Sequence, residues 1–533
     1  MKRNLQMMTT LASLAVVTLG LGTQAALAQK SGGILKVYSR STPPSGSILE
    51  EATYDTLTPY MGVMNNLVMQ DQSKTHSTLD NIVPDLATSW SWNADKTKLT
   101  FKLREGVKWH DGKPFTAKDV ICTFDLLQGK SKAKLRKNPR KPWFDNLDRV
   151  SMNGNFEVTF NLKRSQPAFP MLLASGYTPI YACHVPPKTM RTQPIGTGPF
   201  KFVALKQNES ITFAKNKDYW KKDRPYLDGI QYTIIKSRST RILGLVAGKF
   251  DMAFNNDITV PLLSDLKSQA PNMVCDRVAG ASINLIVNKD KPPFDNAKIR
   301  QAMVLTIDRQ SFIDIVSKGE NKIGGAMMPP PQGAWGMSPE FLRTVAGYSP
   351  DVKANREKAR GLMREAGFGP DKRLKMEVST RNVAQYRDPA VILLDQLKEI
   401  YIDATLKTID NSIWHATVAR KDYSVGLNAT AVGTDDPDAN FFENYSCGSE
   451  RNYTGYCNPE LEKLFVKQSM MSDQVERKKL VWDIDKQLQE DGARPFVYHL
   501  QGFNCRQPYV KGYVSHVNSL YDGWRMEDVW LDK

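Results

Sequence analysis

The sequence lacks the short motifs by which most enzyme active sites are recognised. It contains no H-E-x-x-H, no G-x-S-x-G and no glycine-rich dinucleotide loop. Histidine is scarce, with 6 in 533 residues, and none of the 6 cysteines forms C-x-x-C, the usual zinc or redox spacing. His415 could ligate a metal chelate, but a lone histidine is a poor metal site. The sequence therefore argues against an enzyme, a resident metal and a cofactor.

A long uninterrupted apolar run is also missing, which matters for residues 1–28. Lys2 and Arg3 precede an apolar stretch, Leu11 to Leu21, and Ala26-Leu27-Ala28 follows. This order is typical of a secretory signal peptide, here cleaved after Ala28. The alternative, a transmembrane anchor, needs about 20 apolar residues, and polar residues interrupt this run. No cysteine follows to carry a lipid, so we expect a free protein in the periplasm of a Gram-negative cell.

Acidic residues are outnumbered, since 56 Asp and Glu stand against 72 Lys and Arg, a formal charge of +16. Removal of Lys2 and Arg3 with the signal peptide leaves +14. A basic surface can indicate nucleic acid, but export and the wide spread of the charges argue against that partner. The one dense run, Lys130–Lys141, is interpreted as a solvated basic loop. The net charge could attract anionic ligands or lipid headgroups at long range.

The clearest local pattern lies in the stretch Val83–Leu127. Apolar and polar side chains alternate over residues 99–103, which predicts a half-buried strand. After a Glu-Gly turn the alternation resumes at 107–109, which predicts a hairpin. Thr116, followed three residues later by Asp119, is a variant of the capping box and predicts the start of a helix. By local physics this is a hairpin that leads into a helix.

The same stretch, which includes WHDGKPFTAKDVICTFDLL, closely resembles the signature region of the family 5 extracellular solute-binding proteins. Members of that family are the receptors of ABC importers for dipeptides, oligopeptides and nickel chelates. The resemblance covers essentially the whole mature chain, through the segments IGTGPFKF (195–202), NKDYW (216–220), YLDGIQYTII (226–235), AGKFD (247–251), PPFDNAKIRQAMVLTIDRQSFI (292–313) and NPELEKLF (458–465).

The resemblance implies an α/β, periplasmic-binding-protein-like fold, with two α/β lobes joined by a two-strand hinge and a third, inserted lobe. A chain of this length is also too long for a single core. The implied division is a signal peptide (1–28), lobe I in three parts (29–50, 192–285 and 499–533), inserted lobe II (51–191) and lobe III (286–498).

The resemblance also points to a ligand site in segment 374–441. Arg381 falls where dipeptide receptors of the family hold the peptide carboxylate, and a planar guanidinium suits that role. The positions of the family's tryptophan and amino-binding aspartate are Thr430 and Gly433 here. Asp435 or Asp436 could replace the missing carboxylate if the loop shifts; otherwise the ligand has no free α-amino group. Their alternative role is to form turns.

Three aromatic residues near the expected cleft, Tyr38, Tyr54 and Trp414, could stack on a ligand, although each could equally be packed core.

The cysteines fit an oxidising compartment. Cys447 and Cys457 flank a short polar segment, and a disulfide that closes this loop is expected there, as in some dipeptide receptors of the family. Cys122 falls on the apolar face of its helix and is interpreted as a buried thiol. The sequence assigns no partners to Cys183, Cys275 and Cys505.

We therefore expect a monomeric receptor that captures a small, carboxylate-bearing solute, above all a peptide, by hinge closure and delivers it to an ABC permease in the inner membrane. The alternatives are another cargo on the same fold, such as a nickel chelate, opine, sugar or organic acid, and an exported enzyme or chaperone.

Overall fold

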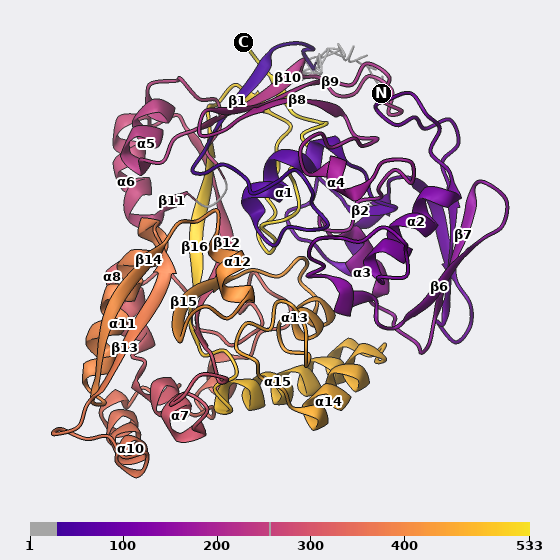
Figure 1. Ribbon diagram of the computed structural model, residues 1–533. Helices are drawn as coiled ribbons and strands as arrows, with labels where there is room; N and C mark the ends of the chain where they lie inside the picture. Colours follow the sequence, from indigo (N-terminus) through magenta and orange to yellow (C-terminus); the bar gives the residue numbers. More distant parts are fainter. Residues whose placement is uncertain (1–28, 255–256) are drawn as a thin grey trace, which may run out of the picture.

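The computed structural model describes residues 29–254 and 257–533 (Figure 1). The expected signal peptide, residues 1–28, lies outside the described residues. Within them, no helix has the length and apolar character needed to cross a membrane.

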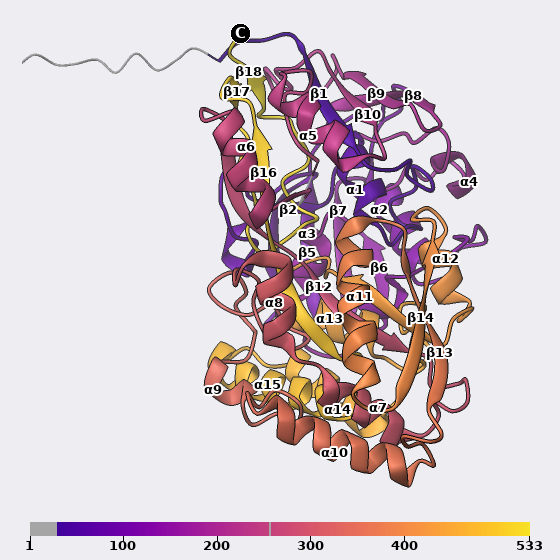
Figure 2. The same cartoon turned by 90° about the vertical axis from the view of Figure 1, so that its left-hand side faces the viewer.

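Two long antiparallel strands, β12 (Val274–Val287) and β16 (Phe496–Arg506), run side by side from the upper half of the molecule into the lower half (Figures 1 and 2). Their register is broken between the pairs Ala279↔Gln501 and Ser282↔His499, where β12 has two residues opposite one. Such a bulge bends a strand and weakens the ladder locally. These two strands form the hinge that the sequence predicts.

The hinge strands belong to a sheet with the order β11-β16-β12-β15-β13-β14. Below the bulge, β12 pairs with β15, and β13 pairs in parallel with β14 and β15. This lower part, with the helices around it, is lobe III. Its further strands are β13 (Leu374–Arg381), β14 (Ile402–Ile409) and β15 (Val425–Thr430). Its helices are α7 (Ala297–Thr306), α8 (Arg309–Ser317), α9 (Pro339–Leu342), α10 (Val352–Glu365), α11 (Ala384–Lys398), α12 (Trp414–Ala419), α13 (Pro437–Asn444), α14 (Pro459–Ser469) and α15 (Gln474–Glu490).

Lobe I, at the top, is built on a sheet with the order β1-β10-β9-β8. Met252 joins this sheet to the hinge by isolated bridges to Val37 of β1 and Arg506 of β16. The elements of lobe I are β1 (Ile34–Ser39), α1 (Tyr54–Tyr60), β8 (Phe200–Lys206), β9 (Ser210–Lys215), β10 (Gly229–Ile234), α5 (Arg238–Val246), β11 (Ile258–Thr259), α6 (Val260–Gln269), β17 (Val510–Lys511) and β18 (Trp530–Leu531).

Lobe II is built on an antiparallel sheet with the order β4-β5-β7-β6, which stands at the side of the molecule (Figure 1). Phe101, Phe160 and Phe124 pack edge to face between this sheet and α2. The elements of lobe II are β2 (Val68–Gln70), β3 (Ile82–Pro84), β4 (Ala87–Trp92), β5 (Lys98–Leu103), α2 (Ala117–Leu127), β6 (Leu147–Met152), β7 (Glu157–Leu162), α3 (Phe169–Ala174) and α4 (Pro187–Met190).

The structure corrects two expectations in lobe II. Residues 107–109 do not pair with residues 99–103; instead β5 pairs with β4 and β7, and Lys108 makes only an isolated bridge to Pro114. Cys122 is not a free thiol, because it forms a disulfide with Cys183. Two further disulfides join Cys275 to Cys505, directly opposite each other on the hinge strands, and Cys447 to Cys457.

Candidate functional site

A small cavity lies where lobes I and III meet at the hinge. Its volume is about 10 Å³, about the room that one water molecule needs. Ala281, in the bulge of β12, forms part of its wall, and a second cavity of about 20 Å³ shares Ala431 with it. The residues around the first cavity are Ala52, Thr53, Tyr54, Ala281, Arg381, Tyr386, His415, Ala429, Ala431, Arg451 and Tyr521.

Arg381, at the end of β13, is 3% exposed and lies against this cavity. Its guanidinium donates to Asn428 Oδ1 at 3.3 Å and to Tyr386 Oη at 3.4 Å, and Nη2 lies 3.4 Å from His415 Nε2. Its Nε has no hydrogen-bond partner, and no carboxylate of the described residues lies within 4.0 Å. A buried guanidinium with this environment is suited to an anionic group.

Neighbouring aromatic rings hold Arg381 in place. The guanidinium lies 4.6 Å from the ring centroid of Tyr386 and 5.7 Å from that of Trp414. Trp414 itself packs in a separate apolar cluster and donates from Nε1 to Asn428 Oδ1 at 3.0 Å. The structure therefore gives Trp414 a supporting position next to Arg381 rather than a place on the cavity wall.

Of the other two aromatic candidates, the structure brings one to the site. Tyr54 forms part of the cavity wall. Tyr38 is wholly buried in the core of lobe I, where its ring meets Phe250 edge to face at 5.6 Å and lies 5.7 Å from the Arg241 guanidinium. Tyr38 therefore takes the packed-core position that the sequence left open, and it is not part of the cavity wall.

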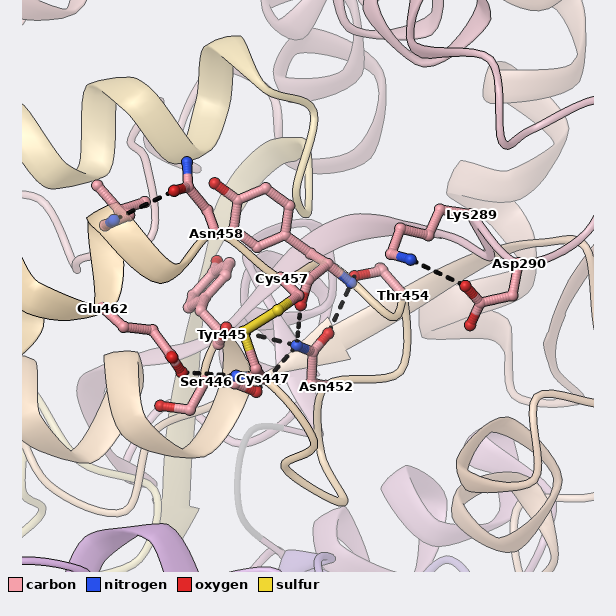
Figure 3. Close-up of a disulfide and its surroundings, with 12 residues drawn as sticks. Lys289, Asp290, Tyr445, Ser446, Cys447, Asn452, Thr454, Cys457, Asn458 and Glu462 are labelled. Atoms are coloured by element: carbon pink, nitrogen blue, oxygen red, sulfur yellow. Dashed lines mark hydrogen bonds and ion pairs between the residues drawn. A yellow bond between two sulfur atoms is a disulfide. The ribbon is translucent and has the colours of Figure 1, made fainter.

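The Cys447–Cys457 disulfide closes the loop that carries Arg451 to the cavity (Figure 3). Inside the loop, Asn452 Nδ2 donates to the carbonyls of Tyr445, Ser446 and Tyr456, so its amide ties both ends together. Arg451 is 2% exposed; its Nη1 lies 3.0 Å from the Glu443 carboxylate, and its Nε has no partner. Arg451 is thus a second arginine at the cavity wall, and the Cys447–Cys457 disulfide constrains the loop that carries it.

His415 is held neutral at this site. Burial, together with the charges of Arg381 and Arg451, lowers its pKa well below the usual value. Its Nδ1 lies 3.2 Å from Tyr453 Oη. The imidazole therefore adds no positive charge at neutral pH.

The structure corrects the expected role of Asp436. Its two carboxylate oxygens accept from Nη1 and Nη2 of Arg477 at 2.9 and 2.8 Å, and it caps α13 by accepting from the backbone N–H of Asp438. The carboxylate is committed to this buried ion pair and to the helix start, so it cannot replace the amino-binding aspartate.

Asp435 and Gly433 also have structural surroundings. Asp435 Oδ2 accepts from the Ala334 N–H at 3.0 Å and from Asn518 Nδ2 at 3.1 Å, and burial raises the pKa of Asp435 to about 6. The Gly433 carbonyl accepts from Ser175 Oγ at 2.8 Å, and a Cβ there would lie 2.4 Å from the Trp143 ring. Trp143 occupies the space that a side chain at 433 needs, so this position offers no anchor for an ammonium group.

A larger cleft of about 810 Å³ is also bounded by both lobes. Arg40 forms part of its wall, and its guanidinium lies 4.6 Å from the Tyr54 ring and 5.7 Å from the Tyr386 ring, both at the small cavity. Arg40 is paired with Asp55. This pair therefore stands between the two spaces.

Sequence reasoning missed Arg40, Arg451 and Tyr521 at the site, and also Arg140, whose guanidinium lies 3.4 Å from the ring centroid of Tyr177, next to Tyr521. The only signal was indirect, since Arg451 lies inside the Cys447–Cys457 loop and Arg140 in the basic run.

Two lobes that enclose a small polar space beside a two-strand hinge define a receptor that captures a solute. The pattern of the bacterial extracellular solute-binding proteins, family 5 Middle, matches residues 81–452, and the chain belongs to this family.

Individual relatives agree with this assignment. The chain is 27% identical over 496 residues to the oligopeptide-binding protein AppA of Bacillus subtilis (strain 168), which covers 88% of this chain and 87% of AppA. The fold matches that of the ABC transporter-associated periplasmic binding protein DppA from Helicobacter pylori in complex with the peptide STSA, with a TM-score of 0.82, 22% identity and coverage of 95% and 99%. It also matches the PBP AgaA from A. tumefaciens R10 in complex with agropinic acid, with a TM-score of 0.78, 22% identity and coverage of 94% and 99%.

Proposed function

We propose that this protein is the periplasmic receptor of an ABC importer and that it captures a small carboxylate-bearing solute, with short peptides as the first class. One observation carries the choice of a carboxylate. Arg381 is a buried guanidinium at a cavity between the lobes and has no carboxylate partner among the described residues. A ligand carboxylate supplies the missing counter-charge.

Hinge closure is the proposed mechanism. A solute enters only when the lobes part, because the cavity of about 10 Å³ in this structure has room for about one water molecule. Held by Arg381 of lobe III and by Tyr54 and Tyr521 of lobe I, the solute contacts both sides. It then favours the closed state by the difference between its affinities for the closed and open states. The bulge of β12 opposite β16 allows the bend. The permease recognises the closed form, and no covalent step is needed.

The lobe division proposed from the sequence is kept with one change. Tyr60 of α1 packs against Phe202 and Phe213 of the lobe I sheet, with ring centroids 5.8 and 5.5 Å apart. Lobe II is therefore taken to begin after α1. The mature chain, residues 29–533, acts as a monomer without enzymatic activity after cleavage of its signal peptide.

A non-peptide carboxylate, such as an opine or another organic acid, is the second candidate. The position of the family's amino-binding aspartate is Gly433, against Trp143, and both oxygens of Asp436 are bound to Arg477. An α-ammonium group in the closed site then has no counter-charge from these residues, which favours ligands without one.

Calorimetric titration with short peptides and organic acids tests the proposal. Arg381→Gln should weaken binding of the tightest ligand by about 10- to 100-fold, since a hydrogen bond to a charged group contributes about 1.5–3 kcal/mol. Arg373→Gln is the control, because Arg373 pairs with Asp403 in the same lobe, away from the cavity. Equal affinity of parent and Arg381→Gln would overturn the carboxylate assignment.

A further inference from the structure

Positive charge exceeds negative charge around the small cavity. The residues Arg40, Arg140, Arg381 and Arg451 are 6%, 1%, 3% and 2% exposed. Asp55 pairs with Arg40 and Glu443 with Arg451. No carboxylate of the described residues lies within 4.0 Å of Arg140 or Arg381. Two buried positive charges are therefore left without a direct counter-ion.

Arg140 comes from lobe II, just before the short turn at residues 141–144. Its Nη1 donates to the Glu51 carbonyl, and its Nε and Nη2 have no hydrogen-bond partner. Its guanidinium lies 3.4 Å from the ring centroid of Tyr177, whose ring lies 4.6 Å from that of Tyr521 at the cavity. Arg140 thus sits one aromatic layer away from the cavity wall.

The carboxylates of Glu51, whose backbone carbonyl Arg140 contacts, and of the preceding Glu50 are already engaged. Glu51 accepts from Ser45 and Arg136, and Glu50 forms a two-point ion pair with Arg191. Neither carboxylate is an ion-pair partner of Arg140.

The guanidiniums do not remove this excess by releasing protons. A guanidinium stays charged at any physiological pH. His415 is already neutral because its pKa is lowered. Burial raises the pKa of Tyr386, but the charges of Arg40 and Arg381 outweigh it and lower that pKa overall. Uncompensated buried charges are unfavourable even after relaxation. Negative charge from outside the chain relieves them.

We propose that the solute of this receptor carries two anionic groups, one bound at Arg381 and the second directed to Arg451, with the charge of Arg140 behind the rings of Tyr521 and Tyr177. The chemical class is a short dicarboxylate, either a dicarboxylic acid or a short peptide with an acidic side chain. Arg451 is suited to the second group because its Nε is without a partner at the cavity. This inference rests on the proposed receptor function and narrows its substrate class.

Calorimetric titration of the full mature chain with two matched pairs of probes tests the charge requirement. The pairs are glutarate against valerate and Ala-Glu against Ala-Gln, which differ by one negative charge at similar size. At least one dianionic probe should bind about tenfold or more tightly than its partner. Equal affinity within both pairs overturns the dianion inference and leaves the receptor function standing. No binding by any probe at millimolar concentration overturns both.

A variant separates the role of Arg140 from general stability. Arg140→Gln should reduce the preference for the dianionic probe by about tenfold while the monoanionic probe changes little, and Arg140→Lys should restore the preference. Arg309→Gln is the matched control, since Arg309 is 4% exposed and donates to the carbonyls of Phe496 and Gly347, away from the cavity. An unchanged preference in Arg140→Gln, with the Arg140→Lys protein folded and active in binding, overturns the assignment.

Discussion

Arg40 of lobe I donates from Nη1 to Gln385 Oε1 of lobe III at 3.1 Å, beside the larger cleft that Arg40 lines. A second bond joins the two lobes, from Asn411 Nδ2 to Asp55 Oδ2 at 3.1 Å. Both bonds would break if the lobes moved apart. They form a polar latch beside the solute site.

Removal of the latch should shorten the life of the closed state. Gln385→Ala deletes the acceptor of the Arg40 bond, which contributes about 1 kcal/mol, so we expect ligand to dissociate about fivefold faster. Stopped-flow displacement measures this rate. Gln310→Ala, which removes an exposed bond to Asp314 on α8, is the control. A dissociation rate equal to that of the parent would show that the latch does not hold the lobes.

The ion pair of Asp436 with Arg477 should matter for stability and not for ligand binding. Arg477 is 1% exposed and contacts both Asp436 and Asp438. Arg477→Met leaves buried carboxylates unpaired and should lower the free energy of unfolding by about 3–5 kcal/mol. Urea unfolding measures the loss, and calorimetry should give nearly unchanged affinity. A large loss of affinity in a stably folded variant would place Asp436 in the ligand site instead.

The disulfides should differ in their effects. By loop-closure entropy, the Cys275–Cys505 link across 230 residues contributes about 5 kcal/mol and the Cys447–Cys457 link across 10 residues about 3 kcal/mol. Paired Cys→Ser variants compared by denaturant unfolding should follow that order.

The effects of the two disulfides on ligand affinity should follow the opposite order to their effects on stability. Loss of Cys447–Cys457 frees the loop that carries Arg451, so it should weaken binding more than loss of Cys275–Cys505 does. If both paired variants bind equally well, the loop closure does not position Arg451.

Stability should fall in acid because of His499. Its Nε2–H donates to the Gly325 carbonyl at 2.9 Å, and burial lowers its pKa to about 4. The pKa in the folded state is below the unfolded value, so the stability that His499 contributes above about pH 6.5 is lost as the pH falls toward 4.

Between pH 7.5 and 5.0 this loss is about 2 kcal/mol. The raised pKa of Asp485, about 6, acts in the opposite direction, so parent and variant must be compared. We therefore compare the change in unfolding free energy between pH 7.5 and 5.0 in the two proteins. On going to pH 5.0, His499→Gln should lose about 2 kcal/mol less than the parent. Identical pH profiles would contradict the buried, neutral state of His499.

Local patterns predicted local structure well. The Thr116–Asp119 capping box begins α2, as its spacing predicted. The alternation at 107–109 did not mark a strand, because β5 pairs with β4 and β7 instead. The paired residues Thr100 of β5 and Thr159 of β7 are 59 residues apart in the sequence. Register over such separations is set by the packing of the whole lobe.

The site was only partly predictable for the same reason. Arg381 follows from the family pattern, but its partners Tyr386, His415 and Asn428 are brought together by three different elements. Arg140 lies in a basic run that the sequence predicts to be a solvated loop, and only the fold shows that it is 1% exposed. The Cys122–Cys183 pair joins a helix to a loop 61 residues away, which helical periodicity cannot reveal.

Small-angle X-ray scattering tests hinge closure most directly. Protein stripped of bound solute by unfolding and refolding is measured alone and then with saturating Ala-Glu or, if it binds better, glutarate. Capture between two lobes predicts a smaller radius of gyration with ligand and a return to the larger value when the ligand is dialysed away. An identical scattering curve with and without a ligand that calorimetry shows to be bound would contradict it.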